Sequence, residues 1–416
     1  MIALELHRRD VIKSITLAGV SALLISNSST TASEAEDEWE KIGAAFVRQE
    51  PLINLNNAAV SPPTLATEAA MIDAYRFANK NPDVNMWRTI DSSLIDIKRK
   101  LAGIADCEPS EIALNRNATE SLCPAIFGIP LPKEAEVVIS DWDFPSMRKA
   151  WEQRARREGV KVRTAKFDLL DSDEDIVEAY VREFGPRTKA ILLTHMIHWN
   201  GRVLPVARLC EIARQNGILS IVDAAQSFAH IPLSFRQMNC DYLGASLHKW
   251  LCAPYGNGML IVRAARIDET WPLLAPFDPE PLAIEKFEHF NLGTYSSPAQ
   301  RAVESAINFH NTLGVSRIHA RLAKLTRYWV SQASDINGFN LHTPLDHPDT
   351  GGLALFSIEG VRPEHIEKRL LEDFKIRVRY RRNMNLEGVR VSPQIYTMTS
   401  DLDHFVTALR TIAREG

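Results

Sequence analysis

The residue types best suited to catalysis lie close together in the middle of the chain. A short apolar run ends at Asp223, and further along Lys249 follows closely after Ser246 and His248. A lysine amine can form a Schiff base with an aldehyde, and a carboxylate can keep a pyridine nitrogen protonated so that the ring acts as an electron sink. Taken singly, Asp223 would be interpreted as an ordinary helix cap and Lys249 as an ordinary surface lysine, the usual case for both residue types. In this order and context, however, the residues predict a pyridoxal phosphate site.

The elements predicted around these residues place them at the edge of a sheet. From about Pro51 onward, short β-rich runs alternate with helix-length amphipathic stretches. The predicted strands are 137–140, 161–163, 190–194, 219–223 and 259–262, and the predicted helices are 146–158, 173–184 and 206–216. This alternation indicates an α/β fold with a mostly parallel sheet and helices on both faces. Active sites of such sheets lie beyond the carboxyl ends of the strands, where Asp223 is expected.

A smaller C-terminal α/β unit is predicted to begin near Val315. Its predicted elements are a helix to Ala333, a strand at 353–358, a helix at 363–374, a strand at 376–380 and a last helix from Asp401. We therefore predict an N-terminal arm at 34–60, a large cofactor-binding domain at 61–314 and a small C-terminal domain at 315–416. The sequence contains no internal repeat and no low-complexity linker.

Composition limits the classes of function. The chain has 416 residues, 45% hydrophobic and 24% charged, and its 48 basic and 52 acidic residues leave a net charge of -4. These values argue against intrinsic disorder and against nucleic-acid binding through bulk positive charge. The cysteines are Cys107, Cys123, Cys210, Cys240 and Cys252. Because they form no CxxC pair and are odd in number, we expect neither a metal site nor a disulfide framework.

The first residues have the three parts of an export signal. A charged segment with Arg8 and Arg9 precedes a modest apolar stretch at 15–25, and a run of small residues follows. The paired arginines resemble a twin-arginine signal, so we predict such a signal over 1–33 and a periplasmic mature protein. An amphipathic or disordered tail on a cytoplasmic protein is the alternative. The apolar part is too short to span a bilayer, and we expect no membrane segment in the mature chain.

Several motifs in order give the chain a family resemblance that covers essentially everything after the signal. The motifs are Asn54–Ala59, Arg116–Ser121, Asp223–Gln226, Ser246–Lys249 and Arg390–Ser392. Together they resemble the class V group of fold-type I pyridoxal-phosphate-dependent enzymes, and within it the isopenicillin N epimerase-like branch. The resemblance implies a large domain with a mostly parallel sheet flanked by helices, a smaller C-terminal domain, and pyridoxal 5′-phosphate as the cofactor.

The resemblance also implies roles for the central residues. Lys249 is the Schiff-base lysine and proton shuttle, Asp223 pairs with the pyridinium nitrogen, and Gln226 donates a hydrogen bond to the phenolic oxygen.

The phosphate would lie at a predicted helix start. Ala118 and Thr119 resemble the phosphate-binding turn, where backbone N–H groups meet an anion. The alternative is a simple helix cap. Ser246 and His248 are similar to the family's further phosphate donors, although a histidine beside a lysine on a loop is commonly just solvated.

Other roles lie around the ring and across a subunit boundary. Phe144 falls where the family stacks an aromatic ring on the cofactor, or it is a core residue. His198 or Asn200 would contact the phenolic oxygen. Thr294 resembles a residue that reaches the phosphate of the neighbouring subunit, which implies a homodimer with shared sites; the alternative is a turn.

The substrate end is predicted around Arg390, whose two-pronged guanidinium matches an α-carboxylate. Asn57 is carried over from the family as a second substrate-binding residue. An arginine-rich run precedes Arg390, and one or two of its members could select an acidic side chain or a second carboxylate. These are Arg377, Arg379, Arg381 and Arg382.

These features predict an enzyme that acts on the α-carbon of an amino acid or an amino-acid-bearing peptide. Aminotransferase-like tailoring in the periplasm is the favoured reaction, with epimerisation or C–S/C–N lysis as the alternative. No cysteine follows Cys252, which argues against a persulfide-forming desulfurase. A non-catalytic scaffold is the other class of function. Retention of Lys249, Asp223, Gln226 and Arg390 together counts against it.

Overall fold

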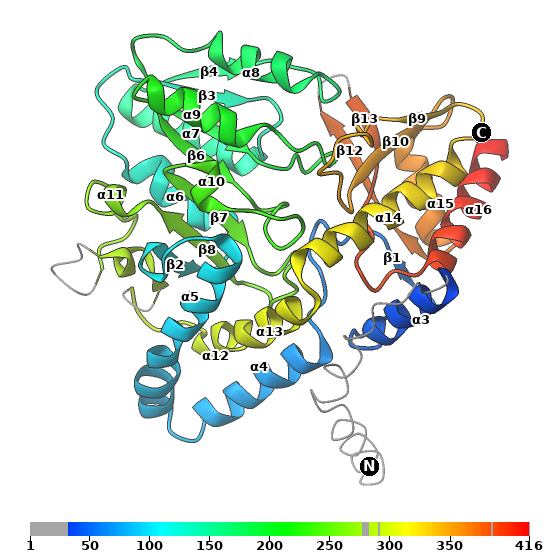
Figure 1. Ribbon diagram of the computed structural model, residues 1–416, viewed down its shortest axis with the longest axis horizontal. Coiled ribbons are helices and arrows are strands. Elements are labelled where there is room, and N and C mark those ends of the chain that lie inside the picture. The colour runs from blue at the N-terminus through cyan, green and yellow to red at the C-terminus, as the bar shows by residue number, and fades with distance from the viewer. Residues whose placement is uncertain (1–31, 277–282, 290–291, 384–385, 416) are drawn as a thin grey trace.

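The centre of the molecule is a seven-stranded sheet with the strand order β2-β8-β7-β6-β5-β3-β4. The structure is a computed structural model that describes residues 32–276, 283–289, 292–383 and 386–415 (Figure 1). The strands are β2 (Ile112–Asn115), β3 (Glu136–Ser140), β4 (Lys161–Ala165), β5 (Thr188–Thr194), β6 (Leu219–Asp223), β7 (Tyr242–Ser246) and β8 (Gly258–Val262). Within this sheet β8 runs antiparallel to both of its neighbours, and the other pairs are parallel. The predicted α/β fold with a mostly parallel sheet is confirmed.

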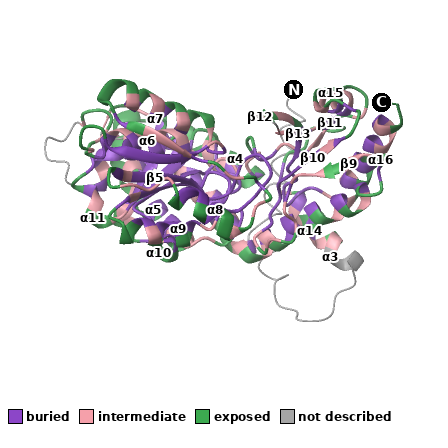
Figure 2. Ribbon diagram, turned by 90° about the horizontal axis from the view of Figure 1, so that it is seen from above, coloured by how far each residue is buried: buried purple, intermediate pink, exposed green. Residues whose placement is uncertain are grey.

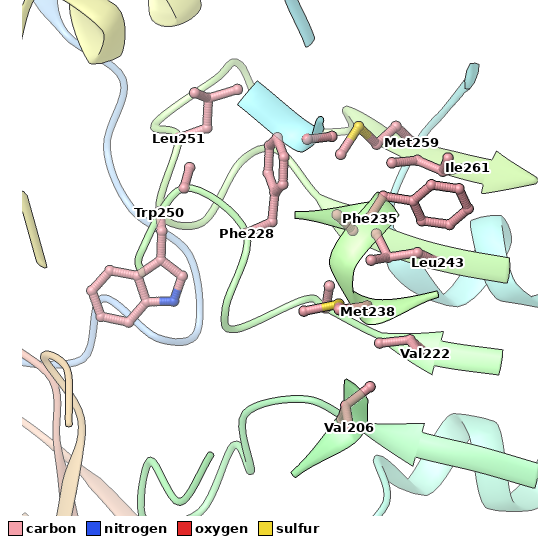
Figure 3. Packing of buried hydrophobic residues seen from close by; sticks show 14 of the residues in the cluster. Val206, Val222, Phe228, Phe235, Met238, Leu243, Trp250, Leu251, Met259 and Ile261 are labelled. Carbon is pink, nitrogen blue, oxygen red and sulfur yellow. The ribbon is translucent and has the colours of Figure 1, made fainter. Parts of the chain in front are cut away.

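Helices cover both faces of this sheet, as Figure 2 shows from the edge. On one face lie α6 (Ala118–Gly128) and α7 (Pro145–Glu158), which pack through Leu122 and Trp151. On the other lie α5 (Asp91–Ala105), α8 (Asp173–Val181), α9 (Val206–Gln215) and α10 (Phe235–Met238). The α9 helix forms because its buried residues recur at helical spacing along one stripe. Figure 3 shows how Phe235 and Met238 pack against the apolar side chains of β6, β7 and β8.

The C-terminal unit has its own antiparallel sheet in the order β12-β13-β10-β9. Its strands are β9 (Phe339–Leu341), β10 (Ala354–Ile358), β12 (Arg379–Asn383) and β13 (Leu386–Val391). The helices α14 (Val315–Ala333), α15 (Pro363–Glu372) and α16 (Thr399–Glu415) share a second hydrophobic core with it. The strand predicted at 376–380 is divided, because Ile376 and Arg377 form β11 (Ile376–Arg377), which pairs with β1 (Ile53–Asn54).

The N-terminal arm packs on the C-terminal unit. Its helix α3 (Ala32–Gly43) places Glu36 2.7 Å from Nη1 of Arg321 on α14, and the Arg321 guanidinium lies 5.1 Å from the ring centroid of Trp39. The predicted export signal lies almost wholly on residues 1–31, outside the described residues, and the predicted domain boundaries stay predictions.

The remaining elements connect these units. They are α4 (Leu65–Ala78), a π-helix at Asp83–Ile90, short 3₁₀ helices at Pro109–Glu111 and Ile284–Phe287, α11 (Ala264–Ile267), α12 (Ser297–Arg301) and α13 (Val303–Leu313). Across the described ranges, no helix is long and apolar enough to cross a membrane. The same ranges contain no cluster of His, Cys, Asp or Glu side chains that could hold a metal ion.

Candidate active site

A cavity of about 400 Å³ lies at the carboxyl ends of the central strands. Thr194, Asp223 and Ser246 end β5, β6 and β7, and all of them line it. Parallel strands bring their carboxyl ends to one edge, which explains why residues distant in sequence meet here. The predicted site residues on the wall of this cavity are Ala118, Thr119, Phe144, His198, Asp223, Gln226, Ser246, His248 and Lys249.

Lys249 lies three residues after the end of β7 and lines the cavity together with Asp223. Desolvation lowers the pKa of its amine to about 8, Asp223 raises that pKa, and the charges of Arg390 and Arg381 lower it further. Burial in turn raises the pKa of Asp223, although the N–H of Ala225 and the charge of Lys249 lower it. The Ala225 N–H donates to Asp223 Oδ1 at 2.9 Å. The site therefore combines an amine that deprotonates readily with a buried carboxylate.

The amide of Gln226 is held in one orientation. Its Nε2 donates to the carbonyl of Ala58 at 2.9 Å, and its Oε1 accepts a hydrogen bond of 2.9 Å from Nε1 of Trp250. The Trp250 ring stacks on His230 with a centroid separation of 3.6 Å. Because Gly352 N–H donates to His230 Nε2, His230 carries its hydrogen on Nδ1 and donates it to the Gln226 carbonyl. Gln226 lines the cavity, and its Nε2 keeps a second hydrogen for a further acceptor.

A helix N-terminus forms one end of the cavity. Helix α6 begins at Ala118, and the side chain of Asn117 caps it by accepting from Glu120 N–H at 2.9 Å. The Ala118 N–H donates to Oγ of Ser246 at 3.0 Å. A Cβ at Gly258 would lie 2.6 Å from the backbone nitrogen of Asn117, so this turn can approach β8 only because residue 258 is glycine. The helix cap and the turn predicted to bind the phosphate are therefore the same piece of backbone.

His248 lies beside this turn. Its Nδ1 donates to the carbonyl of Asn257 at 2.9 Å, since that carbonyl can only accept. Burial lowers the pKa of His248, the hydrogen bond to Asn257 raises it, and the charge of Lys249 lowers it.

Two rings form another part of the wall. Phe144 and His198 meet edge to face with centroids 5.2 Å apart, and Nζ of Lys249 lies 6.0 Å from the Phe144 centroid. Burial lowers the pKa of His198 well below its usual range, and Arg381, Arg390 and Lys249 lower it further. Its Nδ1 is buried without a hydrogen-bond partner. His198 is therefore a neutral ring with a free polar atom.

Two predicted cofactor residues lie away from this cavity. Asn200 is buried in the loop after β5, where Nδ2 donates to the carbonyl of His342 and Oδ1 accepts from Arg202 N–H. Its amide thus holds the loop against the C-terminal unit. Thr294 is exposed on the surface of the single chain.

The side-chain amide of Asn57 is occupied by hydrogen bonds within the protein. Its Nδ2 donates to the carbonyl of Ser392 at 3.0 Å, and its Oδ1 accepts from the hydroxyl of Tyr396 at 2.7 Å. These bonds hold the N-terminal arm against the segment that follows β13. Arg390 lies on β13 itself.

Arg390 is a fully buried arginine on β13. Nη1 donates to the carbonyl of His198 and Nη2 to Oδ1 of Asn56, both at 2.9 Å. Its Nε has no partner, and no carboxylate of the described residues lies within ion-pair distance of it. Burial lowers the pKa of Arg390, and the charges of Arg381 and Arg379 lower it further. A buried cation without an ion pair is costly, so this position is suited to bind an anion.

Sequence reasoning missed part of the lining. Arg116, Asn117, Thr194, Met196, Ala225 and Gly256 also line the cavity. Arg116, Asn117 and Ala225 lie within motifs that the sequence analysis singled out, so those motifs gave the signal. Thr194 and Met196 lie at and just after the end of β5, shortly before His198. Gly256 has no side chain that could indicate a role. Trp250 was also missed, because its role depends on a contact with Gln226 that folding creates.

The lining fits pyridoxal 5′-phosphate. Lys249 supplies an amine for the aldehyde, Asp223 a carboxylate for the pyridine nitrogen, and the α6 N-terminus with Ser246 a set of donors for the phosphate. The volume of the cavity, about 400 Å³, is also within the range of small-molecule sites.

Comparison with solved structures agrees with this fold. The chain superposes on the *Escherichia coli* cysteine desulfurase CsdA with a TM-score of 0.79 at 20% identity, covering 91% of this chain and 98% of that one. It superposes on the cystine C–S lyase C-DES with a TM-score of 0.80 at 19% identity. This superposition covers 87% of this chain and 98% of that one.

Sequence relatives agree as well. Isopenicillin N epimerase of *Streptomyces clavuligerus* is 28% identical over 91% of this chain and 99% of its own length. A probable cysteine desulfurase of Synechocystis sp. is 27% identical over 88% of this chain and 91% of its own length. The model of the aminotransferase class-V family matches residues 53–405. The chain therefore belongs to the aminotransferase class-V family, whose cofactor is pyridoxal 5′-phosphate.

Proposed function

We propose that the protein uses pyridoxal 5′-phosphate to act on the α-carbon of an amino acid or an amino-acid-bearing peptide, in aminotransferase-like tailoring. The observation that carries the proposal is the pairing of Lys249 and Asp223 in one cavity, with the uncompensated Arg390 bonded to the backbone of the lining residue His198. The cavity lining thus provides cofactor attachment and ring protonation, and Arg390 beside it provides carboxylate binding.

Each residue has a defined task. When bound, pyridoxal phosphate withdraws electrons from the bonds of the substrate α-carbon. Lys249 Nζ would hold the cofactor, and the same amine would accept or return a proton at the substrate α-carbon. Asp223 keeps the ring nitrogen protonated, and the Gln226 amide donates to the ring oxygen. Arg390 binds the α-carboxylate and so fixes which bond at the α-carbon faces Lys249.

Persulfide-forming desulfuration is disfavoured by the cysteines. None of the five lines the cavity. Burial raises the pKa of Cys252 to about 12, and its Sγ lies against Gln394 in the protein interior. A thiol in this state is a poor nucleophile.

An epimerase is the second candidate, favoured by the isopenicillin N epimerase relatives. A C–S or C–N lyase is a third, since cysteine desulfurases are also among the relatives. The three reactions differ in the product. We would incubate the purified enzyme with a panel of L-amino acids and a 2-oxo acid in deuterated water. Transfer gives a new amino acid from the oxo acid, epimerisation gives the D-isomer with deuterium at Cα, and lysis releases ammonia. A protein that gives none of these, yet binds the cofactor, would refute the proposal in favour of a binding scaffold.

The proposal extends to assembly and location. A homodimer in which Thr294 of each chain reaches the partner's phosphate is supported by the exposure of Thr294, and sedimentation analysis tests it. A monomer at working concentration would contradict it. Export is supported by the sequence of residues 1–33 alone. We expect residues 1–40 fused to a reporter to reach the periplasm, and Arg8→Lys with Arg9→Lys to stop this; undiminished translocation would contradict the twin-arginine pathway.

A further inference from the structure

The four arginines of the segment before Arg390 have different surroundings in the folded protein. Arg377 and Arg379 share one carboxylate, because their Nη1 atoms lie 3.8 Å and 3.6 Å from Oε1 of Glu367 on α15. Arg382 is exposed to solvent. These side chains have the ordinary environment of surface charges, and Arg381 does not.

Arg381 is a partly buried cation that makes no ion pair with the described residues, and the charge of Glu367 acts on it only from beyond ion-pair distance. Its Nε is shielded from solvent and makes no hydrogen bond. Within the part of the chain that the structure describes, no carboxylate lies within ion-pair distance of it. Its guanidinium instead lies 5.9 Å from the centroid of the Trp199 ring. Shielding a charge in this way is costly unless a partner compensates it, so the position calls for an anionic ligand.

The strand register directs Arg381 toward the candidate site. Arg379 on β12 pairs with Arg390 on β13, and Arg381 pairs with Gly388. Because side chains alternate along a strand, Arg379, Arg381 and Arg390 lie on the same face of the sheet. Of the two arginines on β12 that share this face with Arg390, Arg379 pairs with Glu367 and Arg381 makes no ion pair with the described residues. Gly388 has no side chain to stand between Arg381 and Arg390.

The two guanidiniums meet one short segment of the large domain. Arg390 donates to the carbonyl of His198, and Arg381 lies against the next residue, Trp199. The ring of His198 lines the cavity that holds Lys249. The charge of Arg381 also lowers the pKa values of His198, Lys249 and Arg390, which agrees with this placement.

We infer that Arg381 binds a second carboxylate of the substrate, so that the enzyme selects an amino acid or peptide that carries an acidic group besides its α-carboxylate. The inference rests on the proposed function, in which Arg390 binds the α-carboxylate. A guanidinium suits this task because its N–H donors match a carboxylate in pairs. A substrate with a neutral side chain of the same size would leave Arg381 without an anion to bind.

The test compares acids with their amides on the holoenzyme. We would titrate the visible absorption of the bound cofactor with L-aspartate, L-glutamate and L-2-aminoadipate, and with the side-chain amide of each. We expect at least one acid to bind roughly 10-fold or more tightly than its amide. Arg381→Gln should remove that preference, so that the acid loses affinity relative to its amide. Arg381→Lys should keep part of it. Arg382→Gln, a substitution of an exposed neighbour, should behave as the wild type.

The outcomes separate this inference from the proposed function. Equal binding of acid and amide by the wild type, or an equal loss of both in Arg381→Gln, would overturn the role of Arg381 while leaving an α-carbon enzyme. A wild type that responds only to neutral amino acids would overturn it too. Absence of any response to any amino acid would contradict the proposed function itself. Circular dichroism of each variant checks that it is folded.

Discussion

Trp250 Nε1 donates a hydrogen bond of 2.9 Å to Oε1 of Gln226, and this bond determines which way round the Gln226 amide is held. The residue directly after Lys249 therefore orients the amide that we propose as the donor for the cofactor ring oxygen. Trp250 in turn stacks on His230, which accepts a hydrogen bond from Gly352 of the C-terminal unit.

The first prediction concerns this bond. Trp250→Phe keeps an aromatic ring on His230 but frees the Gln226 amide, so we expect cofactor affinity to fall about 10-fold and the pH midpoint of the cofactor's visible band to shift. Absorption titration measures both. Trp151→Phe is the matched control, since Trp151 is fully buried and its Nε1 has no partner. Equal spectra for the two variants would show that the bond does not orient Gln226.

The second prediction concerns pH. The pKa of Lys249 is lowered to about 8 from an ordinary 10.5, so the amine is protonated below pH 8 and nucleophilic above it. We expect the rate at which the apoenzyme captures pyridoxal phosphate to rise about tenfold per pH unit up to that midpoint and then level off. Stopped-flow absorbance measures the rate.

Asp223→Asn sharpens this pH test. The Asp223 charge raises the pKa of Lys249, so its removal should move the midpoint below 8, while the asparagine oxygen still accepts from Ala225 N–H. A wild-type midpoint near 10.5 would mean that Lys249 is not desolvated.

The third prediction concerns Arg390. Arg390→Lys retains a charge but loses the paired donors, and we expect amino-acid substrates to bind about 10- to 100-fold more weakly. Spectral titration with an L-amino acid and with the matching amine that lacks the carboxylate separates the effects. Amine binding should be unchanged. If both ligands weaken equally, Arg390 acts only through its bonds to His198 and Asn56.

The fourth prediction concerns the phosphate turn. Gly258→Ala forces a Cβ to 2.6 Å from the backbone of Asn117, so we expect a loss of about 1–3 kcal/mol in the free energy of unfolding. Chemical denaturation measures it. Gly103→Ala is the control, because nothing lies within 4 Å of its added Cβ and alanine favours helix α5 by up to about 1 kcal/mol. An unchanged stability in Gly258→Ala would contradict the tight approach of the turn to β8.

The sequence patterns predicted the parallel sheet well because β5 and β6 are apolar runs rich in β-branched residues. They missed β7, whose sequence is YLGAS. Its Gly244 is required by packing, since a Cβ there would lie 2.5 Å from Cγ of Leu122 on α6. Such a requirement exists only between elements that are far apart in the chain.

The candidate site likewise contains residues that the sequence predicts and residues whose surroundings it does not predict. Asp223 could be found because it ends β6, an apolar run that the sequence shows. Lys249 lies after the missed β7, and it was found from its place behind Ser246 and His248, downstream of Asp223. The four arginines at 377–382 could not be sorted by sequence. Glu367 compensates two of them only because α15 packs beside β12. Asn200 was expected at the cofactor because it shares a polar loop with His198, yet its contacts are with the C-terminal unit.

The measurement that tests the central claim most directly is the visible absorption of the purified protein beside that of Lys249→Ala, each before and after amino acids are added. We predict that the wild type carries the band of a lysine-bound cofactor and that an amino acid changes it. Lys249→Ala should lack that band while its circular dichroism matches the wild type. The same band in Lys249→Ala, or no band in a wild type supplied with pyridoxal phosphate, would contradict the account.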